Sequence, residues 1–164
     1  MSLLNKEPVK RAEKALKEFS NSLSVIELDN SARTALDAAD SLNCEVGAIV
    51  KSLLFKCEDL FILCLVSGDK RCSLNKLKKI LSIKDISMAS PEEVKLQTGY
   101  TIGGVSPVGH LNKINIFIDQ SLERFNDIFA AAGHPNCVFK ISFKNLSKIT
   151  NGDIKDIIEW ENPN

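Results

Sequence analysis

The most constraining feature of this sequence is a pair of apolar runs separated by only two acidic residues. KSLLFKC begins at Lys51 and LFILCLV ends at Val66, with Glu58 and Asp59 between them. Runs of this length, rich in branched and aromatic residues and joined by so short a polar break, predict an antiparallel hairpin. Because both runs are apolar almost throughout, we expect the hairpin to be buried on both faces.

Helices are expected before the hairpin. Apolar residues between Pro8 and Phe19 recur at helical spacing, with lysines and glutamates between them. A second helix is expected from Ser31, a suitable N-cap, to about Asn43, followed by a short helical turn in EVGAIV. The apolar stripe of this second helix consists of Ala32, Ala35, Leu36, Ala39 and Leu42.

After the hairpin, the signals alternate between helix and strand. Ser73 is expected to cap a basic helix, and Ser90 opens a capping box whose helix ends at Thr98 and Gly99. The segments INIFID, DIFAAAG and CVFKISF are expected to be strands, and a terminal helix or two should end at Trp160. This mixture predicts an α/β (α+β) domain spanning residues 1–164, with one mixed, mostly antiparallel sheet flanked by helices.

Charge and composition exclude several classes of protein. The chain has 164 residues, with 21 basic and 21 acidic side chains, so its net charge of zero argues against a general nucleic-acid binder. A local basic patch that holds one end of an RNA remains open. No apolar run is long enough for a membrane helix, and charges interrupt the N-terminal segment, so we expect a cytoplasmic protein without a signal peptide.

The cysteines do not form a recognisable site. There are five, they include no C-x-x-C pair, and none has zinc-finger spacing with either of the two histidines. We expect reduced and mostly buried thiols, with no metal and no cofactor. The positions are Cys44, Cys57, Cys64, Cys72 and Cys137.

Familiar catalytic patterns are also missing. Ser106 lies in G-V-S-P, which lacks the G-x-S-x-G elbow, and only His110 and His134 offer a base for a triad. Asp37 and Asp40 are expected on the solvated side of a helix rather than as a catalytic pair. No phosphate-binding loop or dinucleotide fingerprint is present.

Four features remain as candidates for a site, and each has a plainer alternative. Lys51 opens an otherwise apolar strand, where it should face a cleft or an anion unless it only extends to solvent from the strand end. The segment Gly103–Pro107 offers backbone N–H groups to an oxyanion or a ribose-phosphate, or is an ordinary tight connection. Gly133–Asn136 is a second glycine-bearing turn, or a plain hairpin turn. A basic segment, or an ordinary solvated helix face, comprises Lys70, Arg71, Lys76, Lys78 and Lys79.

Taken in order, these segments resemble a known family. ALDAADSLN and EVGAIVKSLLF are followed by LVSGDKRCSLNKLKKIL, TGYTIGGVSPVGH, INIFIDQSL, AAAGHPNCVFKIS and LSKITNGDIKDI. The series resembles the YbaK/EbsC family, which is similar to the editing insertion domain of bacterial prolyl-tRNA synthetase. The resemblance covers about residues 20–158. The family's functional lysine falls on Lys51, and its G-x-x-x-P loop falls on Gly103 to Pro107.

The resemblance implies trans-editing, which is the hydrolysis of a wrongly charged tRNA by a separate protein. The substrate would be tRNA for proline carrying cysteine, alanine or another small residue, with prolyl-tRNA synthetase as a further partner and no membrane or DNA partner. Lys51 would serve the terminal phosphate or the carbonyl, and the attacking group would be water, a tRNA hydroxyl or a cysteine substrate's own thiol. The expected substrate-binding residues are Gly103, Gly104, Val105, Ser106, Pro107, Gly109, His110, Gly133 and His134.

Two other classes of function stay open. The first is a catalytically silent module that binds tRNA ends or nucleotides with the same fold. The second is a structural or protein-interaction domain, which would require a closed cleft. We expect the basic segment to lie on the rim of the Lys51 cleft and to meet the phosphates of the acceptor stem.

Overall fold

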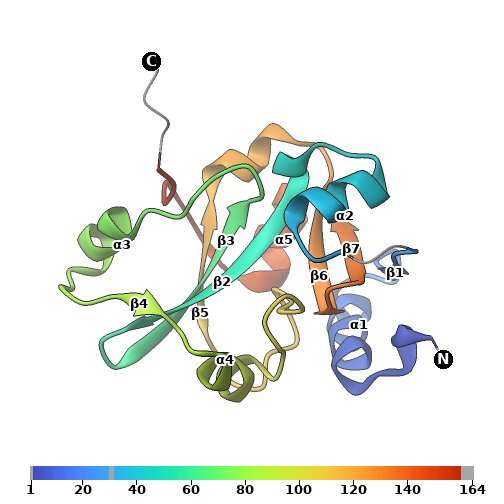
Figure 1. Cartoon of the computed structure of the whole chain (residues 1–164), viewed down its shortest axis with the longest axis horizontal. Coiled ribbons are helices and arrows are strands. Elements are labelled where there is room, and N and C mark those ends of the chain that lie inside the picture. Colours follow the sequence, from blue (N-terminus) through green and yellow to red (C-terminus); the bar gives the residue numbers. More distant parts are fainter. Residues whose placement is uncertain (1, 30–31, 160–164) are drawn as a thin grey trace.

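The computed structural model describes residues 2–29 and 32–159, and within them eight strands form one mixed sheet with helices on both faces (Figure 1). The strand order is β1-β7-β6-β2-β3-β5-β8, and β4 pairs with β2 beside this path. The strands are β1 (Val25–Glu27), β2 (Ile49–Cys57), β3 (Leu60–Ser67), β4 (Ser87–Met88), β5 (Asn115–Asp119), β6 (Ile128–His134), β7 (Cys137–Ile141) and β8 (Asp153–Lys155).

The helices cover both faces of this sheet. Buried side chains of α1, α4 and α5 pack on one face, and those of α2 and α3 pack on the other. None of the helices within the described ranges is long and apolar enough to cross a membrane. The helices are α1 (Glu7–Phe19), α2 (Ala35–Leu42), α3 (Leu74–Leu81), α4 (Pro91–Thr98) and α5 (Phe143–Thr150), with short 3-10 turns η1 (Leu3–Asn5), η2 (Val46–Ala48) and η3 (Gln120–Arg124).

The hairpin expected from the two apolar runs is the centre of the sheet. β2 and β3 pair antiparallel from Val50↔Ser67 to Cys57↔Leu60, and each has a parallel neighbour on its outer side, β6 beside β2 and β5 beside β3. Successive side chains of a strand point to opposite faces. Leu63 therefore packs into the core under α1, whereas Cys64 packs into the core under α3. The prediction of a buried interior hairpin and of a mixed sheet flanked by helices is confirmed.

Helix ends follow the capping signals of the sequence. The Ser73 hydroxyl accepts a hydrogen bond from the Lys76 N–H at the start of α3. Ser90 and Glu93 form the expected capping box of α4, with Pro91 in its first turn. Gly99 ends that helix in the left-handed region, with φ of 80°. These three predictions are confirmed because they depend only on neighbouring residues.

Two predicted helix boundaries and one predicted core position are wrong. The side chain of Thr34 caps α2, three residues after the predicted cap, and Ser31 lies outside the described residues. Leu36 of the predicted apolar stripe is 59% exposed, and α2 instead buries Ala38 and Ala39, so the buried face is shifted from the predicted stripe.

The last helix also ends earlier than predicted. The structure places the end of α5 at Thr150, with Asn151 left-handed at its C-cap. The chain then continues as β8, which pairs in parallel with β5. Ile157 and Ile158 are buried under α3, so their apolar character reflects packing against the sheet rather than a helical stripe. Trp160 lies outside the described residues.

Two leucines of the central strand β3 differ in burial and should therefore contribute differently to the free energy of unfolding. Leu63 is 0% exposed and Leu60, in the same strand, is 62% exposed. Leu63→Ala should lower the free energy of unfolding by about 2–5 kcal/mol, because it removes packed methyl groups and leaves a cavity. Leu60→Ala should change it by only about 0.5 kcal/mol. Urea denaturation of both variants measures this difference, and equal losses would contradict the buried interior position of β3.

Candidate functional site

The site lies where β2 separates from β6. These strands pair only at Ile49↔Phe129 and Val50↔Ala130. Farther along, β2 instead pairs with β4, beginning at Phe55↔Met88. Lys51, Ser52 and Leu53 occupy the interval between the two pairings, so a strand edge is left open in the middle of the sheet.

A cavity of about 330 Å³ occupies this opening. Its size is at the lower end of the range for small-molecule sites, and its wall is mainly apolar. The segment before and within α2, the open part of β2, β6 and the glycine loop each contribute to it. The lining residues are Ala32, Arg33, Thr34, Ala35, Ala38, Ile49, Val50, Lys51, Ser52, Leu53, Ile102, Gly103, Val105, Phe129, Ala130, Ala131, Pro135 and Val138.

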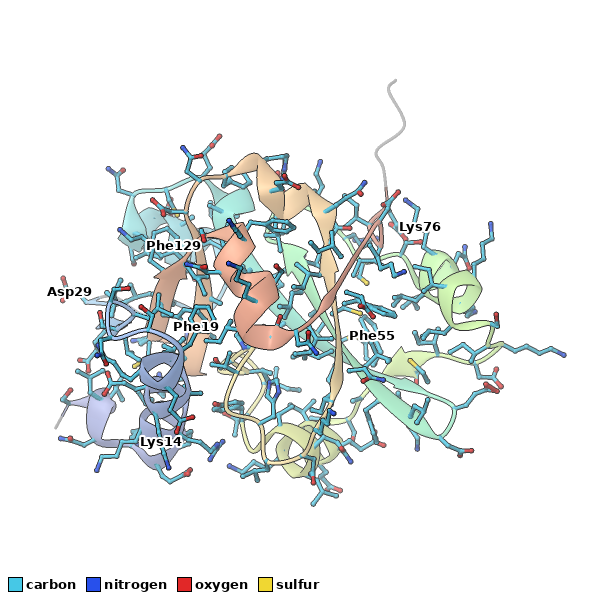
Figure 2. All side chains as sticks on the ribbon, turned by 180° about the vertical axis from the view of Figure 1, so that it is seen from behind. Lys14, Phe19, Asp29, Phe55, Lys76 and Phe129 are labelled. Carbon is cyan, nitrogen blue, oxygen red and sulfur yellow. The ribbon has the colours of Figure 1, made fainter. Side chains whose placement is uncertain are left out.

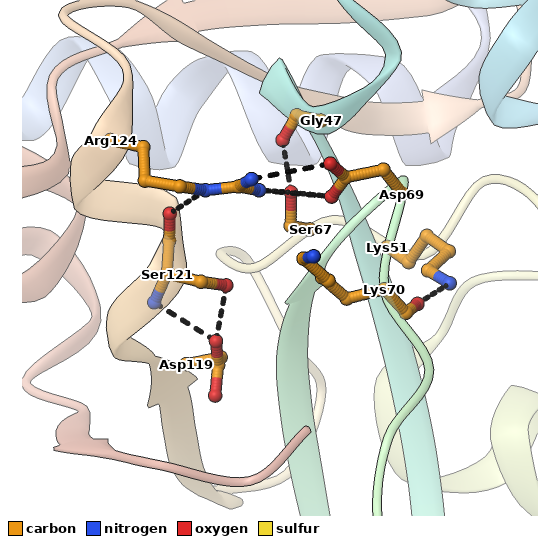
Figure 3. A network of polar contacts seen from close by, with 8 residues as sticks. All are labelled: Gly47, Lys51, Ser67, Asp69, Lys70, Asp119, Ser121 and Arg124. Carbon is orange, nitrogen blue, oxygen red and sulfur yellow. Dashed lines mark hydrogen bonds and ion pairs between the residues drawn. The ribbon is translucent and has the colours of Figure 1, made fainter. Parts of the chain in front are cut away.

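Lys51 lies between this cavity and a second, more open hollow of about 650 Å³. The second hollow is also lined by Asp69, Lys70 and Arg71. The half-buried ammonium of Lys51 donates a hydrogen bond to the main-chain carbonyl of Lys70 (Figure 3). Burial lowers the pKa of Lys51, and the Arg71 charge lowers it further, against the opposing effects of Cys72 and Asp69. The lysine therefore does not simply extend to solvent from a strand end.

The two glycine segments, far apart in sequence, pack against each other. The Gly133 N–H donates to the Gly104 carbonyl at 3.0 Å. A side chain at Gly104 would place its Cβ 2.9 Å from the main chain of His134, and one at Gly103, where φ is 92°, would crowd Pro135. Glycine is required at both positions because another backbone or ring occupies the space of a side chain.

Arg11 and Tyr100 hold the rest of the glycine loop in place. The Tyr100 hydroxyl donates to the Val108 carbonyl at 2.7 Å. The Arg11 guanidinium lies 4.6 Å over the Tyr100 ring and donates to the carbonyls of Gly99 and Gly109, at 2.9 and 2.8 Å. Burial raises the pKa of Tyr100 to about 12, so its phenol stays protonated as a donor. The sequence contains no local signal for this long-range support.

Only some of the expected substrate-binding residues line the Lys51 cavity. Gly103 and Val105 do, and Pro135 is the lining residue of the second glycine turn. Gly104, Ser106 and Gly133 are buried behind this surface. His134 is used inside its own turn, where Nδ1 accepts the Asn136 N–H at 3.0 Å.

Pro107, Gly109 and His110 instead line a different hollow, next to α1 and α5. The His110 Nε2 contacts the Ser106 carbonyl at 2.6 Å, and a carbonyl only accepts, so Nε2 carries the proton. Burial lowers the pKa of His110, as does the Arg11 charge, against the opposing effect of its hydrogen bond to Ser106. The structure therefore brings neither histidine into the wall of the Lys51 cavity.

The basic segment is divided between different surroundings. Lys70 and Arg71 line the hollow beside Lys51. Lys76 on α3 forms an ion pair with Asp156 at 2.9 Å. Lys78 lines a separate hollow with Lys56 and Lys84, and Lys79 is exposed.

Several lining residues were missed from the sequence. Ile102 and the alanines of α2 and β6 have no chemical signal, and the sequence did not connect the polar side chains of Arg33 and Thr34 with the site; all of them reach the cavity only through the fold. Ser52, next to Lys51, has a buried hydroxyl without a hydrogen-bond partner among the described residues. The polar network around Arg124 was missed as well (Figure 3).

Among residues 2–29 and 32–159, no group of three or more His, Cys, Asp or Glu side chains is arranged to hold a metal ion.

Comparison with known proteins places this chain in a family. A family model for the aminoacyl-tRNA editing domain matches residues 29–149. A solved structure for which a role as a trans-editing enzyme for prolyl tRNA synthetase has been proposed has a TM-score of 0.90 and 37% identity, covering 94% of this chain and 99% of that one.

Two related protein sequences also match about three quarters of this chain. The uncharacterised protein YwhH of Bacillus subtilis (strain 168) is 35% identical over 127 residues, which are 77% of this chain and 80% of that protein. The proline–tRNA ligase of Bacillus velezensis is 33% identical over 121 residues, which are 74% of this chain but only 20% of the ligase. The region that the family model matches contains β2 with Lys51 and both glycine segments, and the expected relation to YbaK-type editing domains is confirmed. The chain belongs to the aminoacyl-tRNA editing domain family.

Proposed function

We propose that this protein hydrolyses the ester of a mischarged aminoacyl-tRNA in trans, in the cytoplasm. The proposed substrate is tRNA for proline that carries cysteine, alanine or another small residue. The observation that carries the proposal is the position of Lys51, whose cation lies between a small apolar cavity and a hollow bearing Lys70 and Arg71. An aminoacyl group would fill the first space while the charged RNA end occupies the second.

The apolar wall of the cavity supports a small aminoacyl side chain. Ala38, Ala130 and Ala131 contribute short side chains, and Phe129 and Val138 close the wall. Apolar surfaces of this kind favour small aliphatic groups by burial and contribute about 0.8 kcal/mol for each buried CH₂. The proposal is limited to small residues because the family resemblance implies them and because short apolar side chains build the wall.

Charge stabilisation and positioning would provide the chemistry. An attacking oxygen or thiol adds to the ester carbonyl, the bond to the ribose oxygen breaks, and that oxygen leaves with a proton. Lys51 would stabilise the negative charge on the carbonyl oxygen, and the N–H groups of Gly103 and Val105, which line the cavity, would hold the ribose and ester. The described residues that line the cavity include no Cys, His, Asp or Glu. The proposed nucleophile is water, a tRNA hydroxyl or the thiol of a cysteine substrate.

A catalytically silent binder of tRNA ends is the second candidate, because the same cavity and cation would serve binding alone. The purified protein should be incubated with tRNA for proline charged with alanine, cysteine, serine and proline. Faster loss of a small mischarged residue than of proline supports editing, whereas binding without ester loss supports the silent module. A purely structural role would require a closed cleft, which the open cavity of about 330 Å³ disfavours.

The first prediction concerns Lys51. Lys51→Ala should lower the rate of deacylation by about a hundredfold or more, because a positioned charge at the carbonyl is lost. Single-turnover assays and circular dichroism measure activity and fold. Lys56→Ala is the matched control, since Lys56 lies in the same strand but is 50% exposed and pairs with Glu93. If Lys51→Ala deacylates every mischarged tRNA at the wild-type rate, the catalytic role of Lys51 is contradicted.

The second prediction concerns the thiols. Replacing all five cysteines by serine or alanine should leave hydrolysis of alanyl-tRNA intact if the variant folds, because no cysteine lines the Lys51 cavity in the part of the chain described. Stability should fall, since four of the five are buried, and burial raises the pKa of Cys137 to about 11, which keeps it protonated. Loss of activity in one well-folded single-cysteine variant would instead support a covalent mechanism.

The third prediction concerns RNA binding. Lys76, Lys78 and Lys79 on α3, replaced together by glutamine, should raise KM for full-length charged tRNA but not for an aminoacyl ester of adenosine. The salt dependence of binding should flatten by about one unit or less for each phosphate that these lysines no longer neutralise. Replacing Lys10, Lys14 and Lys17 on α1 is the control, because α1 and α3 lie on opposite sides of the molecule (Figure 2). Equal losses on both substrates would contradict a role limited to RNA binding.

A further inference from the structure

The orientation of Lys51 depends on a neighbouring turn rather than on its own strand alone. Its ammonium donates to the Lys70 carbonyl, and Lys70 lies in the turn that follows β3. A lysine side chain has four rotatable bonds, so a single acceptor fixes its charge only if that acceptor is itself held in place. The position of the Ser67–Cys72 turn therefore controls where the Lys51 charge lies.

An arginine from a distant part of the chain holds this turn (Figure 3). The Arg124 guanidinium donates to both carboxylate oxygens of Asp69, at 2.9 and 3.2 Å, and to the Ser67 hydroxyl at 2.9 Å. Two parallel hydrogen bonds between a guanidinium and a carboxylate fix direction as well as distance. Burial by itself raises the pKa of Asp69, but hydrogen bonds from Arg124 and Ser67 together lower it, so the carboxylate is charged.

Arg124 is in turn anchored to the sheet. Its Nε donates to the Ser121 carbonyl at 2.7 Å, and the N–H of Ser121 donates to Asp119 at 2.9 Å. Asp119 is 0% exposed at the end of β5, and its other oxygen accepts the Ile157 N–H at 2.8 Å. Hydrogen bonds, joined by the main chain within Ser121 and between Asp69 and Lys70, therefore connect the end of β5 through η3 and the turn to the Lys51 ammonium.

The residues that follow Lys70 in the chain are also held in place. The Arg71 carbonyl accepts the Glu159 N–H at 2.8 Å, and the Ser73 N–H donates to the Ile157 carbonyl at 2.7 Å. A Cβ on Gly47 would lie 3.0 Å from the Asp69 carboxylate and even closer to the Phe125 ring, so glycine there leaves room for the Asp69–Arg124 pair. The Lys70 carbonyl is thus held between two anchors.

We infer that Asp69 and Arg124 are positioning residues for Lys51, acting through the Lys70 carbonyl. This inference rests on the proposed deacylase function. The side chains of Arg124 and Asp69 are 40% and 31% exposed, and a pair this exposed adds little to folding stability. Its main effect should therefore be on the geometry of the site.

Activity measurements separate positioning from a general structural role. Asp69→Asn and Arg124→Met should each lower kcat by about ten- to a hundredfold on an aminoacyl ester of adenosine, with little change in KM, because the charge is misplaced. Arg124→Lys should recover part of the loss. In a Lys51→Ala background neither change should lower kcat further. A substitution that damages the site independently of Lys51 would instead lower the kcat of Lys51→Ala by an additional factor. Lys56→Ala, which breaks the ion pair with Glu93, is the control.

An NMR titration of the Lys51 side chain gives a second readout that is independent of turnover. The ionisable groups around Lys51 in the second hollow are Asp69, Lys70, Arg71, Cys72 and Glu159. The Asp69 charge favours the ammonium, so Asp69→Asn should lower the pKa of Lys51. Since the cationic form is the active one, the alkaline limb of the kcat profile should move to lower pH.

Three results would overturn the inference. These are wild-type kcat in both Asp69→Asn and Arg124→Met, multiplying losses in the Lys51→Ala background, or an unchanged Lys51 titration in Asp69→Asn. Failure of the proposed function would look different. The wild-type protein would then hydrolyse no aminoacyl ester, while the titration would still report whether Asp69 controls the lysine.

Discussion

The site depends on the point at which two parallel strands stop pairing. β2 and β6 share only two residue pairs, after which β2 pairs with β4 and leaves an opening inside the sheet. Backbone groups within a sheet are normally covered by the next strand, so such an opening is stable only where other segments cover it. The start of α2 and the glycine loop provide this cover, and the space left between them is the cavity beside Lys51.

A cation in this position is maintained by its surroundings. Burial lowers the pKa of Lys51, Cys72 and the Asp69 charge compensate in part, and the Lys70 carbonyl accepts a hydrogen bond from the ammonium. A half-buried lysine with a strong hydrogen-bond acceptor is well suited to respond to negative charge that develops on a substrate, because little water has to be reorganised. The polar network of Arg124 and Asp69 links this charge to the rigid end of β5.

The structure brings together only some of the residues that the family resemblance predicts for the site. Lys51, Gly103 and Val105 meet at the cavity, whereas Pro107, Gly109 and His110 face another hollow. The proline–tRNA ligase relatives match this chain over about a fifth of their own length, so the comparison with them concerns that region alone. The cavity next to Lys51 lies within the part of the chain that the family model matches.

The sequence by itself determined the features that depend on neighbouring residues. The hairpin of β2 and β3, the caps at Ser73 and Ser90, and the break at Gly99 follow from local apolar runs, side-chain hydrogen bonds and glycine conformation. Lys51 was identified because a charge in an apolar strand is costly. Only the tertiary structure decided that β2 leaves β6, that Gly104 packs on His134, and that Arg124 reaches Asp69. These contacts join residues far apart in the chain, where local periodicity and spacing carry no information about which surfaces meet.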